Sequence, residues 1–562
     1  MKNHNSRATN SWSILAGIYF SLCTVLYAQV PPRYYNNMLT RKIYIPNQIE
    51  PYNNVNVYTE EDFYNTGEGE YIRFTIKRDI KLSKTISLNC RRVDIIGNGH
   101  KIYEYHNPLK NTSKGKLEYL QEVKGNELFI TEKGKIIKLA ESEPFLAESW
   151  QYDSITNICR IELPNEIREL SIPEDNQTYI SYEAWFVRQR DKVLYAKDGY
   201  IYFTCNCSYK PYHRFRRFTP RPHFTIINGD KTNNGVVIRN HEIVLPKTKK
   251  KMSLSSLPAL IKVQKNCTLS LKNVQLFGTN TCMLENEGIC ILEECSLTLG
   301  TGNAINSKGQ LYVKDCQFSK ISQFAINSIS PRSYTDVSFC KFIRIGKDGS
   351  NCAGIRSLGD TYIGECTFLD ANYCAIWVGQ VNATQDSLLP SALIENNTIR
   401  SSDKWIEEQK KWGLTDGGAI YVAPNNKRTI IQNNYISNFS GHNQNRGIFC
   451  DDGTYNVTIY NNTICGIKNS YDIDLRDCST KNTREIPKGK RFNTNNYVGY
   501  NSCDGYIRCE GPLAFENHNC LFENNILYED SLLRKSRITR NNEQASAIMV
   551  VSKASIPFKA LK

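Results

Sequence analysis

The chain has 562 residues, 20 of them cysteine, and a formal net charge of +14. A chain of this length does not depend on disulfides for a stable core, and its cysteine spacings do not match a zinc ribbon. The excess of Lys and Arg suits a polyanionic partner, which could be an acidic glycan, an anionic surface or nucleic acid; solubility alone is the alternative explanation.

Residues 1–28 have the pattern of a secretory signal peptide. Lys2 and Arg7 supply positive charge, residues 12–26 are apolar, and Ala28 is a small residue suited to cleavage. Cleavage would remove two basic residues and no acidic one, which leaves a net charge of about +12. We therefore expect a secreted or periplasmic monomer of a bacterial cell envelope that binds no nucleic acid, with an uncleaved anchor as the alternative. No later segment is long enough for a spanning helix.

The segment 41–106 is predicted to form the first coils of a solenoid. It contains alternating apolar runs followed by VDIIGNGHKI, in which a strand, a glycine turn and a second strand follow closely. From 107 to 245 the sequence instead alternates apolar and polar residues between turn signals, which is typical of antiparallel hairpins. We therefore predict an inserted antiparallel β-domain over 107–245.

Within that domain, residues 209–224 read YKPYHRFRRFTPRPHF, with five basic residues and no acidic one. Aromatic rings and arginines in this mixture could line a glycan-binding face. A solvated hairpin with extended arginine side chains is the alternative.

The segment 258–530 carries a repeat. One slot recurs every 21 to 37 residues in motifs such as ECSL, DCQF and NNTI, and it is occupied by Cys295, Cys316, Cys340, Cys366, Asn397, Asn434, Asn462, Asn496 and Asn525. A repeat of this length with short β-type runs indicates a solenoid whose coils stack around one core. We expect the cysteines to be small buried fillers and the asparagine amides to hydrogen-bond to one another at a coil corner. Residues 531–562 form a basic C-terminal tail.

A second series alternates with the first, one member per coil: Ile305, Ile326, Ile355, Ile376, Ile420, Ile448, Ile473 and Ile507. VDIIGNGHKI, the NNxI repeats and this isoleucine series resemble the right-handed parallel β-helix superfamily, the pectate-lyase-like group. RGIFCDDGTYNVTIYNNTI, residues 446–464, is similar to stretches of bacterial secreted β-helix glycoside hydrolases. The resemblance implies an all-β, right-handed parallel β-helix that acts on carbohydrate, although lyases, hydrolases, esterases and non-enzymatic tailspikes share that fold.

Strand alternation converts the isoleucine series into an outward column. If each isoleucine points inward, the next residue points outward, and that column reads Asn306, Asn327, Arg356, Trp377, Tyr421, Phe449, Asp474 and Arg508. A second outward column, two residues further on, includes Asp451, Arg476 and Glu510. We therefore expect an aromatic platform of Trp377, Tyr421 and Phe449 that leads into acids and arginines in a glycan-cleaving groove.

The spacing of these acids suggests their chemistry. Asp451 and Asp474 lie one coil and two residues apart, roughly 8 Å between backbone positions, and the same holds for Asp474 and Glu510. Carboxyl groups about 6.5–9.5 Å apart fit inverting glycoside hydrolysis and about 5–5.5 Å fits retention, so the estimate leans towards inversion without excluding the other.

We assign Glu510 as the general acid and Asp451 or Asp474 as the base, with Arg476 and Arg508 keeping the base ionised. By resemblance, the GIFCDDG motif implies that Asp451 and Asp452 are functional, with an Asx turn as the alternative for Asp452. His442 and Arg446, in the loop that enters this coil, could reach substrate.

Two other functions use the same residues. A polysaccharide lyase would abstract the proton beside a uronate carboxylate with Arg476 or Arg508, and the acidic side chains would bind calcium; no other cofactor is expected. A non-catalytic, adhesin-like solenoid would use these groups only as surface ion pairs. The sequence does not decide between these functions and leaves the sugar, the linkage and the mode of cleavage open.

Overall fold

The structure is a computed structural model. It describes residues 53–64, 71–104, 116–118, 127–130, 135–138, 145–146, 150–153, 155–165, 178–184, 187–204, 223–227, 237–239, 242–244, 257–279, 281–346, 352–380, 389–409, 417–439, 445–454, 456–467, 470–476, 496–509, 521–523 and 525–527.

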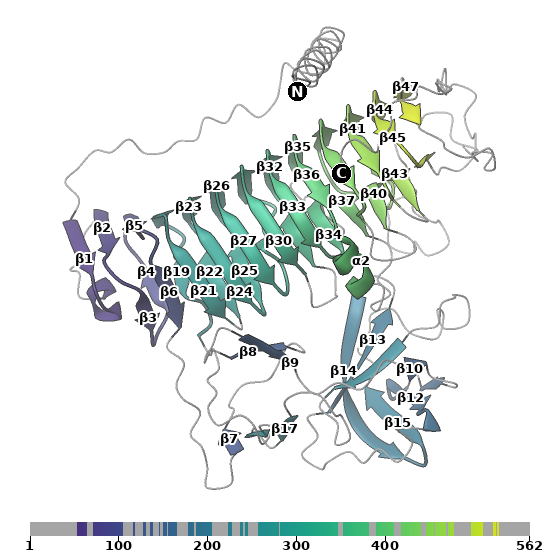
Figure 1. Cartoon of the computed structure of the whole chain (residues 1–562), viewed down its shortest axis with the longest axis horizontal. Helices are drawn as coiled ribbons and strands as arrows, with labels where there is room; N and C mark the ends of the chain where they lie inside the picture. The colour runs from purple at the N-terminus through teal and green to yellow at the C-terminus, as the bar shows by residue number, and fades with distance from the viewer. Residues whose placement is uncertain are drawn as a thin grey trace, which may run out of the picture. The chain divides into compact units, whose positions relative to one another are not determined.

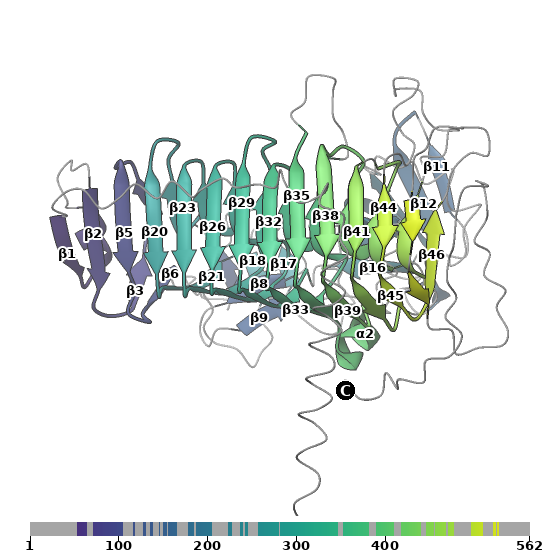
Figure 2. The same ribbon diagram turned by 90° about the horizontal axis from the view of Figure 1, so that it is seen from above.

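Within those residues, most strands belong to three parallel sheets, of thirteen, twelve and eleven strands, whose members lie side by side along the stack (Figures 1 and 2). The thirteen-stranded sheet contains β1 (Asn53–Val57), β2 (Tyr71–Ile76), β5 (Arg92–Ile96), β20 (Thr268–Lys272), β23 (Ile289–Glu293), β26 (Gln310–Lys314), β29 (Tyr334–Ser338), β32 (Asp360–Gly364), β35 (Ser391–Glu395), β38 (Arg428–Gln432), β41 (Val457–Tyr460), β44 (Tyr497–Gly499) and β47 (Leu521–Glu523).

The twelve-stranded sheet contains β3 (Ile80–Leu82), β6 (Lys101–Glu104), β21 (Gln275–Thr279), β24 (Ser296–Gly300), β27 (Gln317–Ile321), β30 (Lys341–Ile345), β33 (Thr367–Ala371), β36 (Thr398–Arg400), β39 (Tyr435–Ser437), β42 (Thr463–Cys465), β45 (Ser502–Cys503) and β48 (Ile526–Leu527). The eleven-stranded sheet contains β4 (Ile86–Leu88), β19 (Ile261–Val263), β22 (Cys282–Asn286), β25 (Asn303–Ser307), β28 (Ile326–Ser328), β31 (Ala353–Ser357), β34 (Cys374–Val378), β37 (Gly418–Val422), β40 (Arg446–Cys450), β43 (Tyr471–Leu475) and β46 (Tyr506–Cys509).

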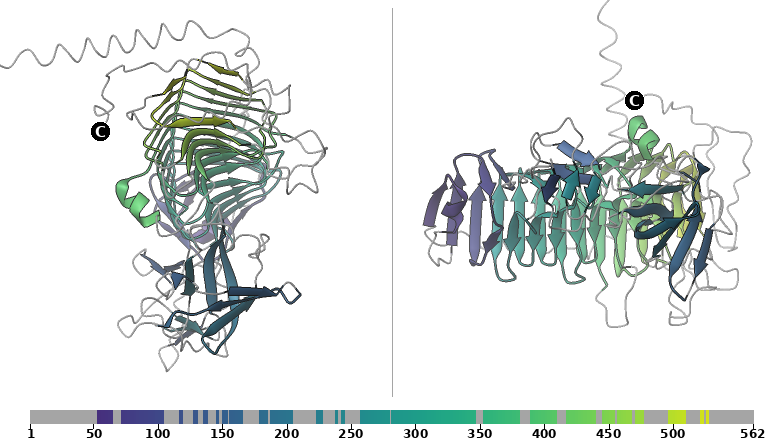
Figure 3. Two further views of the ribbon diagram at one scale, coloured as in Figure 1. Left: turned by 90° about the vertical axis from the view of Figure 1, so that its right-hand side faces the viewer. Right: turned by 90° about the horizontal axis from the view of Figure 1, so that it is seen from below.

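Each coil contributes one strand to each sheet in turn, so the three sheets surround one continuous core (Figure 3, left). One cluster of buried residues extends along the stack from Val57 to Cys503. The predicted parallel β-helix is therefore confirmed. Two short helices accompany the described strands: the 3-10 helix η2 (Glu60–Phe63) and α2 (Asp403–Gln409).

The predicted antiparallel insertion is also confirmed. Its strands form antiparallel sheets and comprise β7 (Lys116–Glu118), β8 (Glu127–Ile130), β9 (Lys135–Lys138), β10 (Phe145–Leu146), β11 (Trp150–Asp153), β12 (Ile158–Glu162), β13 (Tyr179–Ala184), β14 (Val187–Lys197), β15 (Tyr200–Thr204), β16 (His223–Ile227), β17 (Val237–Arg239) and β18 (Glu242–Val244). The β-helix continues across the insertion without a gap in pairing, because β5 pairs directly with β20, β6 with β21 and β4 with β19.

The isoleucine series occupies one register position of the eleven-stranded sheet, as predicted. Ile305 pairs with Ile326, and the same pairing continues through every coil to Ile473 and Ile507. Ile305 and Ile473 are fully buried in the core. This register fixes the outward column, because side chains alternate between the two faces of a strand.

The corner ladder confirms the predicted role of cysteine and asparagine but corrects one member. Each ladder residue follows a residue with a left-handed φ of 50° to 57°, namely Glu294, Asp315, Phe339, Glu365, Asn396, Asn433, Asn461 and Tyr500. Asn397 Nδ2 donates to Asn434 Oδ1 at 2.9 Å, and the amide of Cys295 donates to Cys316 Sγ at 3.3 Å. The described cysteines are free, and those of the ladder are buried.

Asn501, and not the predicted Asn496, continues the ladder. Asn462 Nδ2 donates to Asn501 Oδ1 at 3.0 Å, and Asn501 Nδ2 donates to Asn525 Oδ1 at 2.9 Å. Asn496 lies at another corner, where it accepts from the Val457 amide. The prediction was wrong because the left-handed position before the ladder residue is Tyr500 in this coil, which breaks the NN pattern.

Several predictions fall outside the described residues: the signal peptide, residues 209–222 and the tail after 531. In the part of the chain that the structure describes, no helix has the length and apolar character needed to cross a bilayer.

Candidate functional site

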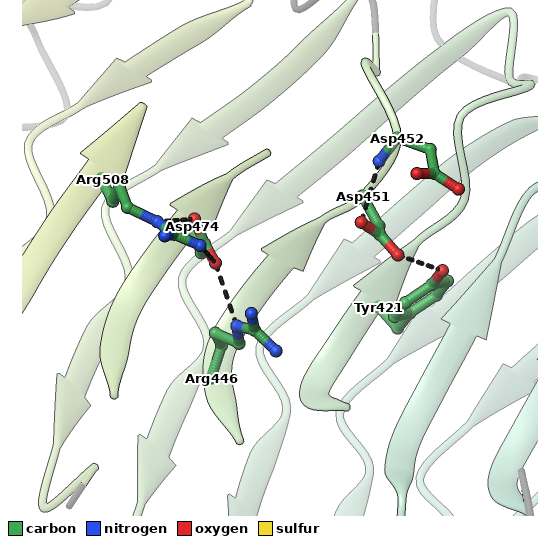
Figure 4. A network of polar contacts seen from close by, with 6 residues as sticks. All are labelled: Tyr421, Arg446, Asp451, Asp452, Asp474 and Arg508. Atoms are coloured by element: carbon green, nitrogen blue, oxygen red, sulfur yellow. Dashed lines mark hydrogen bonds and ion pairs between the residues drawn. The ribbon is translucent and has the colours of Figure 1, made fainter. Parts of the chain in front are cut away.

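The candidate site lies on the outer face of the eleven-stranded sheet, in the coils of β37, β40, β43 and β46. Tyr421 pairs with Phe449, Phe449 with Asp474, and Asp474 with Arg508, so the column has the predicted order. Cys450 pairs with Leu475, which sets Asp451 beside Arg476 one residue further on. Figure 4 shows the six labelled side chains of this region.

Strict alternation of side chains fails just before the isoleucine, where two consecutive residues, such as Ala375 and Ile376, both face the core. The residue before the isoleucine is alanine or glycine in six of the eight coils, and Ala375 and Ala419 belong to the buried core. The residue two before the isoleucine then shares the outer face with the predicted column. Arg446 therefore starts strand β40 rather than lying in a loop as predicted, and its guanidinium lies 4.0 Å from the Phe449 ring centroid.

The three predicted aromatic residues are in contact. Trp377 and Tyr421 have centroids 5.2 Å apart, and Tyr421 and Phe449 5.4 Å apart, both with edge-on geometry. Trp377 is 6% exposed, Tyr421 5% and Phe449 0%. The expectation of an exposed platform is thus corrected: the outward aromatics form a second packed cluster with Tyr373. Strand alternation determines which face a side chain takes and does not reveal what covers that face.

Asp451 is held by two neutral donors. Its Oδ2 accepts from the Tyr421 hydroxyl at 2.9 Å, and its Oδ1 accepts from the Asp452 amide at 2.9 Å. Asp452 is half-buried and has a left-handed φ of 55°, followed by Gly453 at 79°. The turn therefore bends the chain immediately after Asp451 and directs the amide of Asp452 at that carboxylate.

Asp474 has a different environment. It is fully buried, and both of its oxygens bind guanidinium groups: Arg508 Nε and Nη2 at 2.7 and 2.6 Å, and Arg446 Nε at 2.9 Å. Such charge-assisted pairs are the strong hydrogen bonds of proteins. The dashed lines of Figure 4 separate two groups, Asp474 with its two arginines and Asp451 with Tyr421 and Asp452.

The remaining predicted residues divide between described and undescribed parts of the chain. Arg476 is half-buried, and its amide donates to the Cys450 carbonyl at 2.8 Å. Glu510 and His442 lie outside the described residues, so their roles stay predictions. Among the described side chains, no group of three or more His, Cys, Asp or Glu residues is arranged to hold a metal ion.

The sequence reasoning missed a buried carboxyl on the same strand. Asp472 stands where six other coils have alanine or glycine, is fully buried, and accepts from the Gly505 amide at 2.7 Å. Its Oδ1 has no hydrogen-bond partner among the described residues. Burial, with a smaller contribution from Asp504, raises the pKa of Asp472 to about 8. An acid at a position held elsewhere by alanine or glycine was the signal in the sequence.

Comparison with known proteins gives one result to report. No family model matches the sequence, and no curated protein matches it. A solved structure named "Glycoside hydrolase" aligns with a TM-score of 0.47 and 10% sequence identity, over 82% of this chain and 90% of that chain. The proposals that follow rest on residues of this chain.

Proposed function

We propose that the chain is a secreted glycan-cleaving enzyme, most specifically a glycoside hydrolase, which acts on the outer face of the eleven-stranded sheet. One observation carries the proposal: Asp451 lies at the end of the cluster of Trp377, Tyr421 and Phe449, bonded to the Tyr421 hydroxyl. Because the rings themselves are buried, the cluster would hold Asp451 in place through the Tyr421 hydroxyl, and the sugar would meet the carboxylate rather than the ring faces.

In this proposal Asp451 is the carboxylate that acts on the substrate. Its carboxylate accepts from the Tyr421 hydroxyl and the Asp452 amide, and the half-buried Asp452 and Arg476 lie next to it in the chain and in the neighbouring coil. A carboxylate in that position would activate water as general base, while Glu510 would donate a proton to the leaving oxygen.

Asp474 is better suited to positioning than to proton transfer. Its two oxygens already accept three hydrogen bonds from Arg446 and Arg508. Because a buried carboxylate paired in this way is costly to separate from its partners, it holds both guanidinium groups in place. Arg508, about 20% exposed, could then contact the substrate.

The product distinguishes the proposed hydrolase from a lyase. Hydrolysis adds water and creates a new reducing end, whereas elimination creates an unsaturated, ultraviolet-absorbing end. Chelation of calcium would abolish the lyase reaction only.

The test is to incubate the full-length protein and its Asp451→Asn variant with a broad panel of plant, algal and animal polysaccharides. We expect new reducing ends without ultraviolet absorbance, and a loss of at least about 100-fold in the variant, the usual contribution of general acid–base catalysis. Asp336→Asn is the matched control, because it makes the same change on β29 of the thirteen-stranded sheet.

Three outcomes would overturn the proposal in different ways. An unsaturated product would show that the enzyme is a lyase. Full activity of the Asp451→Asn protein would show that Asp451 is not catalytic. Binding of glycans without any cleavage would show that the protein is a glycan-binding module. Equal losses in the Asp336→Asn and Asp451→Asn proteins would indicate a general folding defect instead of catalysis.

A further inference from the structure

Arg356 lies on the same outward column as the candidate site but forms no ion pair with a carboxylate of the described residues. It is half-buried on β31, where it pairs with Asn327 on one side and Trp377 on the other. Its guanidinium carbon lies 4.8 Å from the Trp377 ring centroid and 5.8 Å from that of Phe324. Within the described residues, its Nε is buried and has no hydrogen-bond partner. Burial lowers the pKa of Arg356, as expected for a cation without a counter-charge.

Two neighbouring polar atoms are also buried without partners. Among the residues that the structure describes, the indole Nε1 of Trp377, a residue only 6% exposed, has no acceptor, and Asn327 Oδ1 has no donor. The amide nitrogen of Asn327 is engaged, since it donates to Asn306 Oδ1 at 3.3 Å. Buried polar groups of native proteins are almost always hydrogen-bonded, so three such atoms in adjacent strands indicate an absent partner. Two of the three atoms are N–H donors.

The arginines at the other end of the column show what this position lacks. Arg446 and Arg508 also lie against aromatic rings, those of Phe449 and Tyr471, but each additionally binds Asp474. Arg356 has the aromatic contact without the carboxylate. An arginine held on a ring, with its Nε unsatisfied by the described residues, is suited to bind an anionic group from outside the chain.

We propose that Arg356, supported by Trp377 and Asn327, binds an anionic substituent of the glycan, a carboxylate or a sulfate ester. The inference rests on the proposed function in one respect, that the ligand is a glycan, and it adds that the glycan is acidic. Asn327 Oδ1 would accept a hydrogen bond from a hydroxyl of the same sugar unit.

Arg356 lies close enough to Asp451 along the stack for both residues to contact one bound oligosaccharide, so we place Arg356 in a subsite of the same site. Arg356 and Phe449 are three coils apart in the register, which is about 14 Å along the stack. The contacts between them are continuous: Arg356 lies on Trp377, Trp377 against Tyr421, and the Tyr421 hydroxyl on Asp451. An extended oligosaccharide, and not a single sugar, would bridge this distance.

The test uses matched pairs of oligosaccharides: oligogalacturonate with its carboxyl-reduced form, hyaluronan with its carboxyl-reduced form, and chondroitin sulfate with desulfated chondroitin. Binding is measured by calorimetry with the full-length Asp451→Asn protein, which keeps the ligand intact. We expect the acidic member of at least one pair to bind about 10- to 100-fold more tightly, as a charge-assisted contact provides. Adding Arg356→Gln should remove that preference, and Trp377→Phe, which keeps an aromatic ring, should reduce it.

Arg344→Gln is the matched control, since it removes the same charge from β30 of the twelve-stranded sheet, where Arg344 faces Asp370 at 3.8 Å. Thermal unfolding of each variant checks that the fold is retained. Loss of preference on carboxyl reduction identifies a carboxylate, and loss on desulfation identifies a sulfate; either supports the proposal.

An acidic preference that survives Arg356→Gln, or one that Arg344→Gln removes equally, would overturn the inference. The inference would also be overturned if only the neutral oligosaccharides were bound tightly and cleaved in an Asp451-dependent reaction. In that case the proposed function would still hold. If the protein neither binds nor cleaves any glycan, both proposals fail together.

Discussion

The outward column of the eleven-stranded sheet places arginines in two different settings. At its C-terminal end, Arg446 and Arg508 bind the buried Asp474 from both sides. Three coils earlier than Phe449, Arg356 lies on Trp377 and pairs with no carboxylate of the described residues. The ring contacts are alike, so the difference is the counter-charge. Arg446 and Arg508 receive their counter-charge from Asp474 and belong to the framework of the protein. In our proposal, the counter-charge of Arg356 comes from a ligand.

The largest expected effect is on stability, at the end of the column where Arg446 and Arg508 pair with Asp474. Asp474→Asn should lower the free energy of unfolding by about 3–5 kcal/mol, because it removes this counter-charge from the buried Arg446 and the partly exposed Arg508. Arg356→Gln should change it by no more than about 1 kcal/mol, the usual strength of a cation–π contact. Urea unfolding of both proteins at neutral pH measures the two values. If the two substitutions lowered the free energy of unfolding by similar amounts, the paired and unpaired arginines would not differ in their contribution to stability.

The second prediction concerns the pH dependence of stability, which the buried carboxyl of Asp472 should affect. Burial raises the pKa of Asp472 to about 8 in the folded protein, from the ordinary aspartate value of 3.8. Between these values the folded state binds more protons than the unfolded state, so stability should fall as pH rises, with a slope of up to about 1.4 kcal/mol per pH unit from this residue. The nearby titratable groups Asp504, Cys465 and Cys503 also have pKa values raised by burial.

Asp472→Asn isolates this contribution. The variant should unfold at a higher temperature than the wild-type protein at pH 8 and at nearly the same temperature at about pH 3, because the wild-type carboxyl is then largely protonated in both states. Thermal unfolding across that range measures the difference. A gap that does not change with pH would show that Asp472 is not the titrating group.

The smallest effect is expected at the contact between the aromatic cluster and Asp451. Tyr421→Phe removes the hydroxyl that donates to Oδ2 and keeps the ring, so kcat/KM should fall about 10- to 100-fold while stability changes little. Tyr312→Phe is the control, since its hydroxyl donates to Gln310 on the thirteen-stranded sheet. Unchanged kcat/KM in the Tyr421→Phe protein would show that this hydrogen bond is structural only.

Much of the fold was predictable from the sequence because stacking imposes a strict period. Isoleucine marks one inward position per coil, and that single assignment places Trp377, Tyr421, Phe449, Asp474 and Arg508 on one column. The ladder was predictable for the same reason, except where Tyr500 replaces the asparagine that precedes each later member.

The environment of each outward residue was not predictable. Alternation gives Asp451 and Asp474 the same face, but only the three-dimensional structure shows that one accepts from a tyrosine and the other from two arginines. Arg446 was assigned to a loop because the small residue before Ile448 shifts the alternation by one position. The contact of Arg446 with Asp474 depends on that shift, whereas Arg508 lies on the predicted column.

The most direct test of the proposed site is a crystal structure of the Asp451→Asn protein with an oligosaccharide of the glycan that the wild-type protein cleaves. We predict a sugar chain along the outer face of the eleven-stranded sheet, with a glycosidic oxygen beside residue 451 and an acidic group at Arg356. An oligosaccharide bound to the thirteen-stranded sheet or to the inserted domain, with residue 451 untouched, would contradict it.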